Sequence, residues 1–130
     1  MRRARSGHIL NISSSGGYRS AAGFGVYCST KFAVEGLTEA LADELAPLGI
    51  KATIIEPCYF RTDFLDARSL STSGARIDDY AETAGAVRKH AAQLSHRQPG
   101  DPAKLAAALV ALGGIHRVPH AAAAARHRRH

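Results

Sequence analysis

The spacing of apolar residues in the first half of the chain predicts a strand, a long helix and a second strand. His8 to Ser13 is a short apolar run that follows a glycine and ends among serines and glycines, as is typical of a buried strand. Residues 26–48 carry leucine or valine at steps of three and four, which predicts an amphipathic helix. Lys51 to Pro57 is β-branched in its middle and stops at a proline, which predicts another strand. This order predicts a βαβ unit with two parallel strands.

The predicted helix 26–48 has apolar residues on two faces. The first face carries larger side chains, at Val34, Leu37, Leu41, Leu45 and Leu48. The second face lets another backbone approach closely because its residues are small: Ala33, Gly36 and Ala40. We expect one face to pack on the sheet and the other on a neighbouring helix or subunit, so a homo-oligomer formed through helix 26–48 is a candidate assembly. Gly49 is expected to close the helix in the left-handed conformation.

The pattern after Pro57 is weaker and predicts two shorter helices. Ile77 to Leu94 is amphipathic, with two aspartates near its positive end. Asp101 is expected to cap a helix from Pro102 to Leu112. We divide the chain into a basic N-terminal tail at residues 1–6, a folded domain at residues 7–112 and an Ala/Arg/His-rich tail at residues 113–130, which we expect to be disordered.

Composition and charge exclude several function classes. The 130 residues suit one small globular domain, and no apolar run approaches the roughly 20 residues that span a bilayer, so we expect no membrane segment. The net charge is +6, but residues 7–112 hold ten basic and eleven acidic side chains. The excess positive charge therefore belongs to the two ends, and we expect no nucleic-acid partner, because basic residues are not interleaved with aromatic ones.

Metal and disulfide chemistry are also not indicated. Cys28 and Cys58 lack the spacing of a zinc or redox motif, which predicts two reduced thiols in a cytoplasmic protein. Histidines in the C-terminal tail are three and four residues apart, as in metal-binding helices. Their surroundings are typical of a solvated tail, so we predict no metal site.

Tyr27, Lys31 and Ser14 are the residues whose pattern points to chemistry. Tyr27 and Lys31 are four apart at the start of the predicted helix and hence share a face. A phenol with a pKa of about 10 is a poor acid–base catalyst at neutral pH, but a nearby ammonium lowers that pKa. Ser14 lies at the carboxyl edge of the predicted sheet, where such sheets bind ligands, and can hydrogen-bond a carbonyl or alcohol oxygen. Taken alone, Tyr-x-x-x-Lys is more often a packing arrangement than a catalytic one.

Three motifs in order closely resemble the short-chain dehydrogenase/reductase (SDR) family. They are Asn11-Ile12-Ser13-Ser14-Ser15-Gly16-Gly17, then Tyr27-Cys28-Ser29-Thr30-Lys31, then Glu56-Pro57-Cys58-Tyr59-Phe60-Arg61-Thr62. The resemblance covers roughly residues 7–112. It implies an α/β fold, part of a Rossmann-like, doubly wound parallel sheet. It also implies hydride transfer between NAD or NADP and a small alcohol or carbonyl substrate.

The resemblance assigns roles to individual residues. Ser14 would orient the substrate oxygen, and Tyr27 would be the catalytic acid/base. Lys31 would favour the phenolate and hold the nicotinamide ribose. The cofactor-binding set that the resemblance implies is Tyr27, Lys31, Pro57, Cys58 and Thr62. In that set Pro57 and Thr62 match the family's Pro-Gly-x-x-x-Thr motif, and Cys58 replaces its glycine, which we expect to crowd the cofactor.

The sequence also lacks segments that the family carries. The N-terminal βα units with the glycine-rich phosphate-binding turn are not in the chain, and Gly16-Gly17 does not replace them, because no Gly-x-Gly-x-x-Gly pattern leads into a helix there. We therefore expect a partial domain from a truncated or frame-shifted reading. The alternative to an oxidoreductase is a non-catalytic SDR remnant that at most associates with a full-length relative through the long helix.

Overall fold

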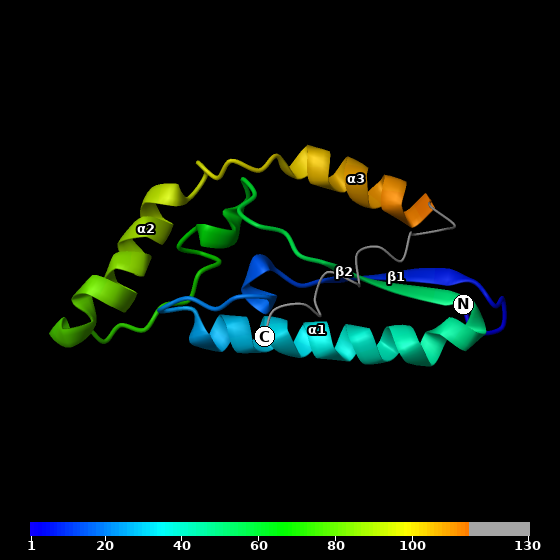
Figure 1. Ribbon diagram of the computed structural model, residues 1–130. Helices are drawn as coiled ribbons and strands as arrows, with labels where there is room; N and C mark the ends of the chain where they lie inside the picture. The colour runs from blue at the N-terminus through cyan, green and yellow to red at the C-terminus, as the bar shows by residue number, and fades with distance from the viewer. Residues whose placement is uncertain (115–130) are drawn as a thin grey trace.

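The computed structural model describes residues 1–114 and contains two strands and three α-helices (Figure 1). In chain order these are β1 (Gly7–Ile12), α1 (Gly25–Leu45), β2 (Ile50–Ile55), α2 (Ala86–Leu94) and α3 (Pro102–Gly114). Strands β1 and β2 pair in parallel, with Gly7 opposite Ile50 and Ile12 opposite Ile55. The predicted βαβ unit is thus confirmed, and each strand begins and ends slightly before its predicted bounds.

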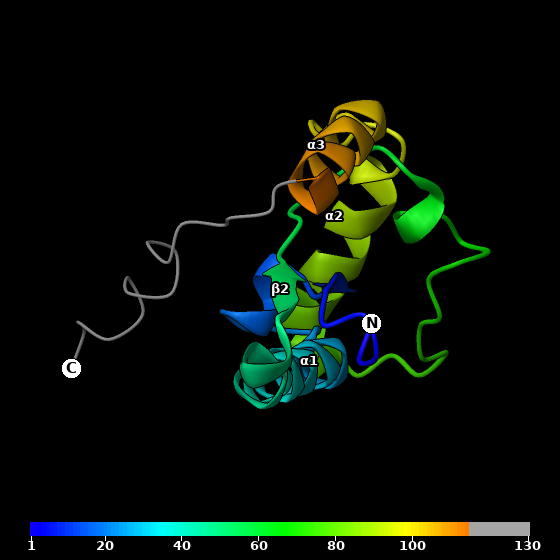
Figure 2. The same cartoon turned by 90° about the vertical axis from the view of Figure 1, so that its right-hand side faces the viewer.

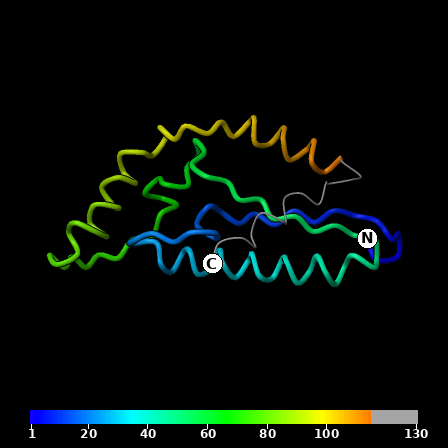
Figure 3. The backbone as a smooth tube through the Cα atoms, in the orientation of Figure 1, coloured from blue at the N-terminus to red at the C-terminus, as the bar shows by residue number. Residues whose placement is uncertain are grey.

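The helices surround the strand pair on three sides. Helices α1 and α3 lie on opposite sides of the pair, and both views agree on this (Figures 1 and 2). Helix α2 lies beyond the carboxyl ends of the strands, and the chain reaches it from β2 through a long irregular segment (Figure 3). The carboxyl edge of the sheet therefore faces the loops that follow β1 and β2, as expected for a ligand-binding edge.

Helix α1 is shorter than the predicted helix 26–48. It spans Gly25–Leu45 and is followed by a 3-10 turn at Ala46–Leu48 that contains Pro47. Proline lacks an N–H and clashes with the preceding turn, which explains why the α-helix does not continue through it. Gly49 follows with a φ of 68°, so its predicted left-handed conformation is confirmed.

The two faces of α1 differ in burial. The face toward the sheet buries Cys28, Glu35 and Thr38, two of which are polar. The opposite face is exposed at Ala33, Gly36 and Ala40. Leu37, which the sequence assigns to the face with the larger side chains, is also exposed, at 65%, so that assignment is wrong for this residue. Burial of the small-residue face, which the sequence predicts, is not found within residues 1–114, because no other described element lies on that side (Figure 1).

The segment predicted as one helix from Ile77 to Leu94 is irregular in its first half. A 3-10 turn at Asp78–Tyr80 and a π-helical turn at Ala81–Gly85 precede α2. Threonine and glycine at positions 83 and 85 favour an α-helix less than the residues of α2 do, which is consistent with the late start.

Helix α3 begins as predicted and ends later. The Ala103 N–H donates to the Asp101 Oδ1 at 2.9 Å, which confirms the cap. The helix continues through Gly114, two residues beyond the predicted end. The rest of the predicted tail and its histidines, at residues 115–130, lie outside the described residues.

Polar side chains take part in the packing between the sheet and α1. Asn11 Nδ2 donates to Thr38 Oγ1 at 2.9 Å, and the Thr38 hydroxyl donates to the Val34 carbonyl at 2.6 Å. Both cysteines are thiols: Cys28 is buried and Cys58 is exposed. Among the described helices none is long and apolar enough to span a membrane, and among the described residues no three His, Cys, Asp or Glu side chains gather as a metal site.

Candidate active site

The loops that follow β1 and β2 are joined at the carboxyl edge of the sheet. The backbone N–H of Ser13 donates to the Ile55 carbonyl at 2.8 Å, and the N–H of Ser15 donates to the Pro57 carbonyl at 3.1 Å. These two bonds continue the strand pairing past the last residues of the sheet. They bring the Ser14 loop and the Pro57–Cys58 segment to the same edge.

Ser14 begins the 3-10 turn at Ser15–Gly17. Its Oγ accepts a hydrogen bond from the Gly16 N–H at 3.0 Å, and its backbone is extended, as an N-capping residue requires. A serine hydroxyl has one donor and two acceptor positions, so this bond leaves the Ser14 O–H to donate to a ligand. The side chain is half-buried. The geometry suits a residue that orients an oxygen atom.

Tyr27 lies in the first turn of α1, half-buried between two other aromatic rings. Its ring centroid is 6.1 Å from that of Phe24, in an edge-on arrangement, and 5.7 Å from that of Phe64. Phe24 is the residue directly before α1, whereas Phe64 lies in the 3-10 turn after β2. Aromatic pairs at these separations attract one another, so the ring position is fixed by two separate segments.

Lys31 lies one turn after Tyr27 on the same face of α1. Its Nζ is 5.7 Å from the Tyr27 ring centroid, close enough for attraction between the cation and the ring. The Nζ also donates to the Ile12 carbonyl at 3.1 Å, at the last residue of β1. The predicted pairing of Tyr27 and Lys31 on one helical face is confirmed, and both lie at the carboxyl edge of the sheet.

Gly16 separates Ser14 from Tyr27. A Cβ atom at Gly16 would lie 3.1 Å from Tyr27 Cε1, 3.2 Å from Cys28 Sγ and 3.5 Å from Ser14 Oγ. The Ser14 hydroxyl and the Tyr27 ring therefore lie near one point that glycine leaves open. Ser14, Tyr27 and Lys31, which the sequence predicts as a catalytic group, are brought together in the structure.

The predicted residues that follow β2 lie near this group without a described contact to Tyr27 or Lys31. The Cys58 thiol is exposed. The Thr62 hydroxyl caps the 3-10 turn Asp63–Leu65 by accepting from the Phe64 N–H at 3.3 Å. Thr62 thus positions Phe64, the ring that packs on Tyr27. Sequence reasoning missed Phe24, Phe64 and the spacing role of Gly16. The contacts of Tyr27 with Phe64 and Gly16 join segments that are distant along the chain, so no local pattern indicates them.

A second set of polar contacts fixes the loop after β2. The Gln98 carbonyl accepts from Arg61 Nη1 at 2.8 Å, and Gln98 Nε2 donates to the Thr62 carbonyl at 3.3 Å. Backbone bonds from Arg61 N–H to the Gly100 carbonyl and from Gly100 N–H to the Tyr59 carbonyl, both 2.9 Å, run alongside. Gln98 is buried, so these bonds hold the loop, and with it Phe64, against the segment that leads to α3.

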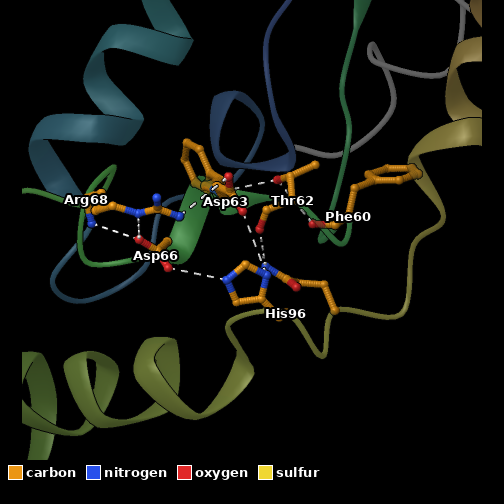
Figure 4. Close-up of polar contacts among 8 residues, drawn as sticks. Phe60, Thr62, Asp63, Asp66, Arg68 and His96 are labelled. Carbon is orange, nitrogen blue, oxygen red and sulfur yellow. Dashed lines mark hydrogen bonds and ion pairs between the residues drawn. The ribbon is translucent and has the colours of Figure 1, made fainter.

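Charged side chains join the same loop to the end of α2 (Figure 4). Asp66 Oδ1 accepts from the Arg68 N–H at 3.0 Å and from Arg68 Nε at 2.9 Å, and its Oδ2 is 3.3 Å from His96 Nε2. The Arg68 backbone N–H, then the Arg68 guanidinium and His96, hold the pKa of the Asp66 carboxyl well below its usual range. Asp66 in turn raises the pKa of Arg68. Because the cluster is largely exposed, we expect it to add little stability.

A parallel strand pair connected by an α-helix, with serine, tyrosine and lysine at its carboxyl edge, defines the chain as part of an α/β, Rossmann-like domain. The family model for short chain dehydrogenases matches residues 1–73. This match covers more than half of the chain, and the chain therefore belongs to the short-chain dehydrogenase family.

Individual relatives support this assignment. The chain is 46% identical over 83 residues to the 3-ketodihydrosphingosine reductase of Bacteroides thetaiotaomicron, covering 64% of this chain and 31% of that protein. It is 38% identical over 106 residues to an oxidoreductase of Botryotinia fuckeliana, covering 82% of this chain and 38% of that protein. The crystal structure of a short-chain dehydrogenase from Streptomyces avermitilis matches with a TM-score of 0.72 and 45% identity, over 92% of this chain and 42% of that chain. The chain spans about a third of the length of these two curated relatives.

Proposed function

We propose that the chain carries the catalytic group of an NAD(P)-dependent oxidoreductase that interconverts an alcohol and a carbonyl compound. The observation that carries the proposal is the placement of Tyr27. Its ring lies 5.7 Å from the Lys31 Nζ and shares the space above Gly16 with the Ser14 hydroxyl. A proton-transferring group, a cation and an oxygen-binding hydroxyl are the parts that this reaction requires.

Tyr27, Ser14 and Lys31 each have one role in the proposed mechanism. In the reducing direction, the substrate carbon gains a hydride while the Tyr27 hydroxyl gives its proton to the substrate oxygen. Ser14 donates a hydrogen bond to that oxygen and holds it beside Tyr27. Lys31 stabilises the phenolate that remains, because an ammonium close to the ring favours the negative charge. In the oxidising direction, Tyr27 takes the proton from the alcohol.

Apart from Cys58, the residues at this edge suit a nicotinamide dinucleotide. When bound, the cofactor would supply or accept the hydride. Lys31 uses one of its three N–H donors on the Ile12 carbonyl, which leaves two for ribose hydroxyls. We propose that Tyr27, Pro57, Cys58 and Thr62 complete the cofactor site. The choice between NAD and NADP is part of the test below.

Cys58 provides a direct test of the cofactor site. Its side chain is exposed at the position where the family carries glycine, so a bound cofactor would meet a Cβ and a sulfur there. We expect Cys58→Gly to tighten binding of NADH or NADPH, measured by titration of the cofactor's fluorescence. Tighter binding by the cysteine form would contradict this steric argument.

Tyr27→Phe tests the catalytic assignment. The phenylalanine ring keeps the contacts with Phe24 and Phe64, so the fold should be unchanged. The cofactor affinity should change by no more than a few fold. Turnover of carbonyl substrates with NADH or NADPH, followed by nicotinamide absorbance, should fall by about a hundredfold or more. A variant that retains a tenth of the rate would remove Tyr27 from the mechanism.

We also propose that a second copy of the chain packs on the exposed face of α1. Its small residues, Ala33, Gly36 and Ala40, permit close approach of two helices, and the exposed Leu37 lies beside them on α1. The same face would serve the alternative function, a non-catalytic chain that associates with a full-length relative. Leu37→Glu should then reduce the molar mass measured by light scattering, whereas Leu112→Glu on α3 should leave it unchanged. An unchanged mass for Leu37→Glu would reject this interface.

A further inference from the structure

An apolar cavity of about 300 Å³ lies beside the catalytic group. Its walls come from the segment before α1, the loop after β2 and the inner face of α2, and include Phe24, Tyr59, Leu65, Val87, His90 and Leu94. Phe24 forms part of the wall and also packs edge-on against Tyr27. The cavity is therefore one aromatic ring away from the residue proposed to transfer the proton.

The chemistry of the lining is selective. The remaining residues of the wall are alanines, and the lining contains no Asp, Glu, Lys or Arg. Moving a charged group into such surroundings without a partner is costly, whereas burial of hydrocarbon is favourable.

A second cavity of about 490 Å³ gives a useful contrast. Its lining includes Arg76, Arg88, Lys89 and Asp78, so its surroundings suit charged groups. Its lining shares no residue with that of the apolar cavity, whose wall includes Phe24, the ring that packs on Tyr27. A charged substrate would find complementary groups in the second cavity and none in the first.

We infer that the substrate is an uncharged alcohol or carbonyl compound whose hydrocarbon part occupies the apolar cavity while its oxygen faces Ser14 and Tyr27; this inference rests on the proposed function. The volume is at the lower end of the range of roughly 300–1,000 Å³ for small-molecule sites. This favours a medium-length aliphatic chain or a single ring. Phe24 lines the cavity and packs on Tyr27, so we expect it to contact the hydrocarbon next to the reacting carbon.

The test measures binding without cofactor, so that it is independent of turnover. The probes are 1-butanol, 1-hexanol and 1-octanol, followed by ligand-observed NMR, with octanoate and octylammonium as charged probes of the same length. Each added methylene should tighten binding about fourfold, which corresponds to burial of about 0.8 kcal/mol per methylene. The two charged probes should bind at least tenfold more weakly than 1-octanol. Octanoate binding as tightly as 1-octanol, or no dependence on chain length, would overturn the inference.

Two substitutions on α2 locate the binding site. Ala86 lines the cavity from its exposed rim, and Ala92 is exposed on the same helix outside the lining. Ala86→Trp should weaken binding of 1-octanol at least tenfold by filling the cavity, and Ala92→Trp should leave it within twofold. Equal effects of the two would show binding to the surface in general and would reject the cavity.

A third variant, His90→Glu, keeps the inference falsifiable if a tryptophan variant fails to fold. His90 is exposed at the wall, and a carboxylate there should weaken octanoate further while improving octylammonium. No change in either would overturn the inference. Alcohols that bind as described to a protein without turnover would reject the proposed function alone. Turnover without alcohol binding in the cavity would reject this inference alone.

Discussion

The βαβ unit at residues 7–55 and the segment at residues 66–114 are held together in different ways. In the first, α1 packs along the strands and buries Cys28, Glu35, Thr38 and Ile50. In the second, only Ala91 and Gln98 are buried, and much of the attachment comes from polar contacts of the loop after β2. The proposed catalytic residues Ser14, Tyr27 and Lys31 belong to the first region, and most of the apolar cavity wall belongs to the second region and the loop before it.

This difference suggests a division of tasks. Residues that transfer protons must be held to within a fraction of an ångström, and a packed helix on a sheet provides that. Residues that enclose a substrate must admit and release it, and weakly packed segments open at lower free energy than a core does. The comparison predicts that equivalent substitutions will have large effects in the first region and small effects in the second.

The largest expected difference concerns two lysines. Lys31→Met should lower turnover by about a hundredfold or more, because it removes a charge that acts on the developing phenolate. It should also weaken cofactor binding and shift the alkaline limb of the pH–rate profile. Lys89→Met, on α2, should change none of these. Rates across pH and cofactor titrations check both variants, and an unaltered pH profile for Lys31→Met would separate the lysine from the tyrosine.

Two glycines test the packing of the two regions. A Cβ at Gly17 would lie 2.5 Å from Ser13 Oγ and 2.7 Å from Glu35 Oε1, both in buried residues, whereas a Cβ at Gly74 meets nothing within 4 Å. Gly17→Ala should lower the free energy of unfolding by about 1–3 kcal/mol through overpacking. Gly74→Ala should change it by less than about 1 kcal/mol, in the stabilising direction. Thermal and urea unfolding measure both, and equal losses would remove the contrast in packing.

Two threonines give a smaller contrast. Thr38 is 1% exposed and accepts the Asn11 amide hydrogen bond, whereas the Thr83 hydroxyl makes only a long, 3.4 Å bond to the Tyr80 carbonyl on the surface. Thr38→Val would leave a donor of Asn11 without its acceptor, which should cost about 1–3 kcal/mol. Thr83→Val should be close to neutral. Restoration of stability in the double variant Asn11→Leu/Thr38→Val would support the hydrogen bond as the cause.

The sequence could predict the features that arise locally. The steps of three and four in residues 26–48 identify the helix by periodicity, and the β-branched run from Lys51 to Pro57 identifies the strand by residue type. The four-residue spacing of Tyr27 and Lys31 places them on one face of any helix. Together with the motifs of the Ser14 loop, these patterns were sufficient for the family and for the proposed catalytic group.

The sequence could not predict the features that arise from tertiary contacts. Glu35 and Thr38 interrupt the apolar pattern and are nevertheless buried. Thr38 finds its hydrogen-bond partner, Asn11, on β1, a contact that no local pattern predicts. Phe64 packs on Tyr27 from a turn that has no periodic signal. The pattern predicts burial of the small-residue face of α1, but periodicity cannot say whether the covering partner belongs to the same chain. The cavity beside Phe24 depends on how α2 sits against the loop after β2.

The smallest expected effect concerns the ion cluster that joins the loop after β2 to α2. The folded-state pKa of Asp66 lies below its unfolded value, so its contribution to stability is present above about pH 3.9, the ordinary value for aspartate, and is lost as the pH falls through the folded value. Asp66→Asn should therefore lower the melting temperature slightly at neutral pH and by less in acid. Asp79→Asn, whose carboxylate makes no described ion pair, should show no such dependence. If the loss of melting temperature in Asp66→Asn stayed constant or grew in acid, the ion cluster would not be what stabilises the loop. The attachment of the second region would then depend on Gln98 and its neighbours alone.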